Sequence, residues 1–98
     1  MILGVRDRKD LEYSVKSVIR NIKVWTDLAR KVIPSQGNVQ EFAYGFACGI
    51  IIGSFTERFL AKNDRQPDRD EMADLFLIMR NQMPAVRRAV LHELVPTE

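Results

Sequence analysis

The sequence predicts an all-α protein, and two observations carry that prediction. From Leu11 to Val32 the apolar residues recur at alternating intervals of four and three, which lines one face of a helix and does not fit a strand. Only four prolines and five glycines occur in 98 residues, too few turn signals for an all-β sandwich of this length. The length is that of one domain, so residues 1–98 are predicted to form a single helical domain.

The first predicted helix covers about residues 8–33. Asp7 and Asp10 can start it, and Pro34 ends it. Apolar residues beside the heptad positions widen its apolar stripe, which indicates contact with more than one neighbouring element. These additional residues are Ile19, Val24, Leu28 and Ile33.

The second predicted helix covers about residues 39–62. Asn38 followed by Glu41 resembles a capping box at its start. Residues 42–56 carry no charge, and their apolar side chains surround the helix, so we expect this segment to be buried on most sides. The uncharged run is shorter than the roughly 20 residues that cross a bilayer, so no membrane segment is expected.

Three glycines recur at intervals of four inside that run, at Gly45, Gly49 and Gly53. Each destabilises a helix by roughly 1 kcal/mol relative to alanine, so a compensating interaction is expected. Small residues at this spacing let a second backbone approach closely. Three interpretations stay open: packing against another helix of the same chain, a self-association groove, or a ligand cleft.

The third predicted helix covers about residues 68–94, with Asp68 and Glu71 forming a second capping box. Pro84 removes one helical hydrogen bond and disfavours a helical Met83, so we predict a kink or a split near Pro84. Three segments of nearly equal length with short linkers predict an antiparallel bundle of three long helices.

The apolar surface of these helices exceeds what one chain of this size can bury. A homodimer or a higher homo-oligomer would cover the surplus. The methionine and phenylalanine side chains of the third helix form a flexible apolar surface that suits a partner helix, with core packing as the alternative. The predicted interface residues are Gly45, Gly49, Gly53, Phe55, Phe59, Met72, Phe76, Met79 and Met83.

Basic residues form a stripe along the first predicted helix. Lys9, Lys16, Lys23 and Arg30 recur at intervals of seven, with Arg20 beside them. Such a stripe can follow the phosphates of a nucleic acid. The alternative is an ordinary solvated face, because acidic residues interrupt the stripe and the net charge of the chain is only +2.

Residues 71–74 form an E-x-x-D pair, Glu71 and Asp74, followed by an apolar run. Over residues 61–78 the sequence resembles the second metal-binding motif of the all-α nucleotide pyrophosphatases, of the MazG-like and phosphoribosyl-ATP pyrophosphatase types. That resemblance implies a dimeric helical bundle holding magnesium between this pair and an E-x-x-E on the preceding helix, where this sequence has Ser54 and Glu57. The alternative is an acidic first turn that caps a helix.

The sequence contains no phosphate-binding loop, dinucleotide-binding fingerprint or paired-histidine metal motif. The single cysteine, Cys48, indicates a reducing, cytoplasmic compartment. We therefore predict a small non-enzymatic interaction or adaptor protein with a regulatory or inhibitory role. We expect it to have no cofactor and no small-molecule substrate. Its expected partners are a second copy of itself and another protein. The second hypothesis is a nucleic-acid-associated protein using the basic stripe, and the third is a degenerate pyrophosphatase-like protein.

Overall fold

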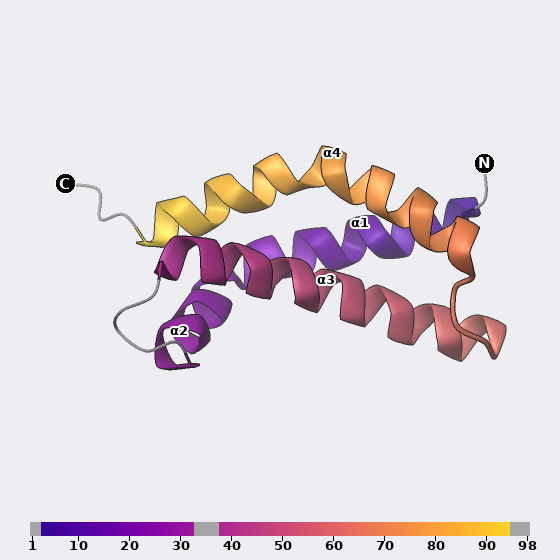
Figure 1. Cartoon of the computed structure of the whole chain (residues 1–98), viewed down its shortest axis with the longest axis horizontal. Helices are drawn as coiled ribbons and strands as arrows, with labels where there is room; N and C mark the ends of the chain where they lie inside the picture. Colours follow the sequence, from indigo (N-terminus) through magenta and orange to yellow (C-terminus); the bar gives the residue numbers. More distant parts are fainter. Residues whose placement is uncertain (1–2, 33–37, 95–98) are drawn as a thin grey trace.

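The computed structural model describes residues 3–32 and 38–94, and these form four helices (Figure 1). They are α1 (Val5–Arg20), α2 (Ile22–Val32), α3 (Val39–Asn63) and α4 (Arg69–Leu94). The described residues contain no strand, and the predicted all-α class is confirmed. The predicted bundle of three long helices is wrong, because the first predicted helix is divided into α1 and α2.

The division occurs at Asn21, whose backbone angles (φ −104°, ψ 23°) leave the helical region. Its side-chain amide donates to the carbonyl of Ser17 at 2.9 Å, and its backbone N–H donates to the same oxygen at 3.1 Å. Asparagine side chains compete with the helix for backbone partners in this way. The heptad spacing continues across the break because Val18 and Ile22 both enter the core. Spacing alone therefore could not reveal the break.

Side-chain capping sets the start of α3 but not that of α1. Helix α1 begins at Val5, three residues before the predicted start and without a side-chain cap; the N–H of Arg8 donates to the carbonyl of Gly4 at 3.0 Å. Helix α3 begins as predicted, because the Asn38 side chain accepts from the N–H of Glu41 at 3.1 Å. The predicted end of the first helix, Ile33 with Pro34, lies outside the described residues.

Helix α4 begins with the predicted capping box in both directions. The N–H of Glu71 donates to the Asp68 carboxylate at 2.8 Å, and the N–H of Asp68 donates to the Glu71 carboxylate at 2.9 Å. The helix then continues through Pro84 as one arched element (Figure 1), so of the two predicted alternatives, a kink or a split, the split is wrong. Pro84 is exposed, whereas Met83 and Val86 are buried and hold the helix on both sides of it.

Helix α3 is the central element of the fold. It runs antiparallel to α1 and α4 and packs against all three other helices (Figure 1). Ion pairs tie both of its ends to these neighbours. Near its C-terminus the Lys62 ammonium lies 3.1 Å from Asp7 and 2.5 Å from Asp10, and near its N-terminus Glu41 accepts from Arg87 at 3.1 Å. The largest fully buried side chains include Phe55, Phe59, Leu11, Ile51 and Leu75.

Candidate interaction surface

The three glycines of α3 point away from the core. Gly45, Gly49 and Gly53 are exposed, and a β-carbon built on any of them would meet nothing within 4 Å in the described part of the chain. Each glycine lies two residues along the chain from the nearest buried residue of α3. Two residues correspond to a rotation of about 200° around the helix axis, so the glycines lie on the opposite side. That stripe consists of Ala43, Ala47, Ile51, Phe55 and Phe59. The glycines therefore do not serve packing between the helices of one chain.

Half-buried apolar side chains border the glycines on both sides. On the side of α4, the Arg87 guanidinium stacks over the Tyr44 ring at 5.1 Å. On the side of α2, the Phe46 and Trp25 rings meet edge to face at 6.4 Å. We call the whole surface the glycine face, which comprises Gly45, Gly49, Gly53, Tyr44, Phe46, Cys48, Ile50 and Ile52.

Acidic residues continue the glycine stripe at its two ends. Glu41 and Glu57 are both exposed and lie four residues before Gly45 and four residues after Gly53. Glu41 is paired with Arg87, whereas Glu57 forms no ion pair with another described residue. The residues of the glycine face are thus uncharged, with one carboxylate at each end of the glycine row and the Arg87 guanidinium over Tyr44.

Cys48 lies on the glycine face and is half-buried. Burial raises the pKa of its thiol above the ordinary value, which keeps the group protonated near neutral pH. A protonated thiol is a poor nucleophile, so this environment suits packing better than covalent catalysis.

The predicted interface residues divide into two groups. Gly45, Gly49, Gly53 and Phe76 are exposed, and Met72 is half-buried. The other four, Phe55, Phe59, Met79 and Met83, are buried within the chain, so they are not available on its surface. The sequence pattern did not separate the groups because α3 is apolar all round, which leaves its inward side undetermined.

A further exposed apolar surface lies on α4 and was only partly anticipated. Phe76 and Leu77 are 52% and 60% exposed, and with Ala73 and Arg80 they line an open pocket. Leu77 was not among the predicted interface residues. The available signal was the apolar run from Leu75 to Ile78, which places apolar side chains on more than one side of the helix.

The basic residues of the predicted stripe are exposed but belong to two helices. Lys9, Lys16 and Arg20 lie on α1, whereas Lys23 and Arg30 lie on α2, beyond the break. Arg30 pairs at 3.7 Å with Asp27, one turn earlier. The seven-residue spacing therefore does not define one straight row of positive charge.

The two carboxylates of the E-x-x-D pair are held by separate partners. Glu71 accepts two hydrogen bonds from the Arg65 guanidinium, at 2.6 and 3.1 Å, which with the capping bond lowers the pKa of its carboxyl. Asp74 accepts from the N–H of Leu3 at 3.0 Å and pairs with Arg8 at 3.3 Å. Among residues 3–32 and 38–94 no group of three or more His, Cys, Asp or Glu is placed to hold a metal ion.

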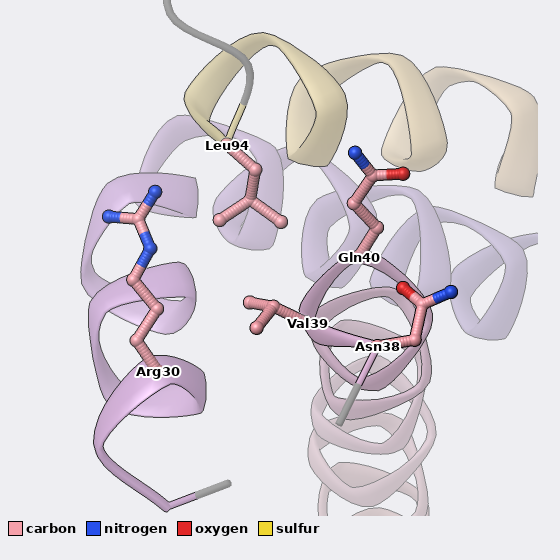
Figure 2. Close-up of a pocket in the computed structure, with 5 residues that line it drawn as sticks. All are labelled: Arg30, Asn38, Val39, Gln40 and Leu94. Carbon is pink, nitrogen blue, oxygen red and sulfur yellow. The ribbon is translucent and has the colours of Figure 1, made fainter. Parts of the chain in front are cut away.

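Figure 2 shows a pocket between the end of α2, the start of α3 and the end of α4. In Figure 2 the Arg30 side chain runs along the end of α2, while Val39 and Leu94 point into the space beside it; Asn38 and Gln40 complete the lining. Residues 33–37 and 95–98 adjoin this pocket in sequence and lie outside the described residues, so we assign it no role.

Comparisons with protein-family models, with curated proteins and with solved structures gave no match to this chain. Within the described residues, no helix is long and apolar enough to cross a membrane.

Proposed function

We propose that this protein is a non-enzymatic interaction module that acts as a homodimer, with the glycine face of α3 as its self-association surface. A regulatory or adaptor role follows from such a module, because dimerisation presents two copies of every other surface. The observation that carries the proposal is the position of the three glycines. Each destabilises α3 by roughly 1 kcal/mol, yet the chain's own packing would accommodate a methyl group at every one of them.

A second α3 helix supplies the missing reason for the glycines. Without side chains at Gly45, Gly49 and Gly53, two helix backbones can approach closely and gain dispersion contacts along their length. The half-buried apolar side chains beside the glycines would then become fully buried. Their burial would add hydrophobic stabilisation to the dimer, as in a core-like interface.

The test is the molar mass of the full chain by size exclusion with light scattering, over a tenfold concentration range. We expect a dimer for the natural sequence and a monomer for Gly49→Leu, because four added carbons separate the two backbones. In the monomer a side chain at position 49 meets open space, so this variant is expected to keep its helical content.

The matched control is Ala61→Leu, which adds bulk at an exposed position of α3 beyond the glycine face and is expected to stay dimeric. A natural chain that is monomeric across the whole range, or a Gly49→Leu variant that remains a dimer, would refute the proposal. Loss of helical content in Gly49→Leu would instead show that the glycine serves the fold, which also contradicts it.

A further inference from the structure

Helix α2 lies at one end of the molecule and exposes a row of apolar side chains (Figure 1). Val24, Leu28 and Val32 recur at intervals of four and are 51%, 39% and 65% exposed, and we call them the α2 row. Successive members are turned by about 40° around the helix axis, so the row covers about 80° of the helix surface. The opposite side of α2 is fixed to the bundle by its buried residues, Ile22, Thr26 and Ala29.

Positive charge borders one edge of the α2 row. Lys31 and Lys23 lie about 20° and 100° from Val24 around the helix, on the side away from the rest of the row. Both lysines are exposed, and neither forms an ion pair with another described residue. Arg30 adds a third positive charge and pairs at 3.7 Å with Asp27. The one carboxylate of α2 is therefore already engaged by an arginine of the same helix.

Acidic residues of the surroundings do not cancel this charge. Residues 13–40 contain five lysines and arginines and one acidic residue, the paired Asp27. Helix α2 packs against α3 and α4 as well as α1. At the start of α3 the Glu41 carboxylate is paired with Arg87, and at the end of α4 the side chain of Glu93 is half-buried. The end of the molecule that contains α2 is therefore net positive.

We propose that α2 binds the surface of an anionic lipid bilayer, with the α2 row immersed at the boundary between headgroups and acyl chains. A helix in this position lies in the plane of the bilayer and does not cross it. The ammonium groups of Lys23 and Lys31 would reach the headgroup phosphates while their aliphatic stems stay beside the apolar row. Attraction of basic residues to the negative surface adds to the burial of the row.

Shape and charge favour a bilayer over other occupants of this surface. The α2 row belongs to one helix and is convex, and a fluid bilayer closes around such a helix without needing a groove. An antiparallel contact between two α2 helices would place their lysine edges together, and a parallel contact would align their macrodipoles unfavourably. A nucleic acid would neutralise the lysines but leave the valines of the row in water. The inference does not depend on self-association through α3.

The experiment uses Trp25, the only tryptophan of the chain, which is half-buried and follows Val24 on α2. The full chain is titrated with vesicles of phosphatidylcholine alone and with vesicles of equal parts phosphatidylcholine and phosphatidylglycerol. Tryptophan emission and co-sedimentation report binding. We expect a blue shift and saturable binding with the anionic vesicles, and at least about tenfold weaker binding to the neutral vesicles. Added salt should weaken the binding to anionic vesicles.

Variants of α2 separate the apolar and the electrostatic contributions. Val24→Ser should weaken binding to anionic vesicles about tenfold, and Lys31→Glu at least about tenfold. Val24→Leu adds one methylene to the row and should strengthen binding about fourfold, a gain that a damaged fold would not produce. The control is Lys9→Glu, the same charge change at an exposed position of α1 about 18 Å before the break at Asn21. This distance exceeds the screening length of about 8 Å in physiological salt, so the affinity should be nearly unchanged.

Several results would overturn the inference. These are no binding up to about 1 mM anionic lipid, equal binding to neutral and anionic vesicles, and unchanged binding of Val24→Ser. A lower molar mass of Val24→Ser in light scattering would assign the α2 row to a second copy of the chain. Tighter binding of a short DNA duplex than of vesicles, unaffected by Val24→Ser, would assign the lysines to nucleic acid. Gly49→Leu leaves α2 intact and should still bind; loss of vesicle binding in that variant would place the contact on the glycine face instead.

Discussion

The position of the Glu71 carboxylate is explained by hydrogen bonds within the fold, without a metal ion. Its oxygens accept from the Arg65 guanidinium and from the N–H of Asp68, while its own N–H donates to the Asp68 side chain. The residue thereby joins the loop before α4 to the first turn of that helix. A magnesium ion bound here would have to compete with these donors for the same oxygens.

This arrangement predicts a pH-dependent contribution to stability. The hydrogen bonds from Arg65 and then the N–H of Asp68 hold the pKa of Glu71 below its ordinary value of 4.5 in the folded chain. The unfolded chain binds a proton more readily, so the contribution is present above about pH 4.5 and is lost as pH falls through the folded-state pKa. Glu71→Gln should therefore lower the free energy of unfolding by about 1–2 kcal/mol at pH 7, and the deficit should shrink by pH 3.

Urea unfolding followed by circular dichroism at pH 7, 5 and 3 measures that difference. Glu12→Gln removes a carboxylate from an exposed site on α1 and serves as the control, with little change expected. A deficit in Glu71→Gln that stays constant down to pH 3 would contradict the ion-pair explanation. Millimolar magnesium should leave the unfolding of the natural chain unchanged, since the carboxylate is already occupied; a magnesium-induced rise would favour the pyrophosphatase-like interpretation.

At the scale of single helices, α4 contains a local defect that the rest of the fold tolerates. Pro84 lies inside a helix of 26 residues, at an exposed position. It provides no N–H for the helical ladder, and its ring crowds the preceding turn. Pro84→Ala is expected to raise the free energy of unfolding by about 1–2 kcal/mol, after allowance for the greater freedom of the unfolded chain.

The measurement is the free energy of unfolding of Pro84→Ala by chemical denaturation. The variant Asn81→Ala is the control. Asn81 is an exposed α4 residue whose replacement by alanine changes helix propensity by at most about 0.7 kcal/mol. If Pro84→Ala is no more stable than the natural chain, the arch of α4 is required for its packing on the core, and a straighter helix would lose contacts that the proline preserves.

The elements differ in how far the sequence determines them. The starts of α3 and α4 were predictable because Asn38 and Asp68 act on neighbouring N–H groups, a purely local interaction. The break at Asn21 was not predictable from periodicity, because the apolar spacing continues through it. Which side of α3 faces inward was also undetermined, so Phe55 and Phe59 were assigned to the interface and are in fact core residues. Choosing between equally apolar sides requires the positions of α1, α2 and α4.

For the whole molecule, the sequence predicted more apolar surface than one chain can bury. Phe76 and Leu77 on α4 and Val24 and Val32 on α2 are more than half exposed, whereas the apolar side chains of the glycine face are half-buried. The exposed pair on α4 was foreseen only in part, because Phe76 was predicted at the interface together with Met79 and Met83, which turn inward.

The proposed dimer leads to a last prediction, which concerns the relative direction of the two α3 helices. Antiparallel packing is expected, because the macrodipoles of two adjacent helices attract in that arrangement and repel in the parallel one. An antiparallel crossing at Gly49 brings Glu57 of one copy toward Glu41 of the other. Glu57→Lys would replace this like-charge contact with an opposite-charge contact and is expected to lower the dimer dissociation constant severalfold.

In a parallel dimer the same substitution would leave two lysines facing each other, so no comparable gain would follow. Sedimentation equilibrium of Glu57→Lys at low and high salt distinguishes these arrangements, because the gain should diminish as salt screens exposed charges. Asp64→Lys makes the same charge change at an exposed position beyond the end of α3 and should leave dimerisation nearly unchanged. Unchanged or weaker association of Glu57→Lys would contradict the antiparallel arrangement, while Gly49→Leu would still test self-association itself.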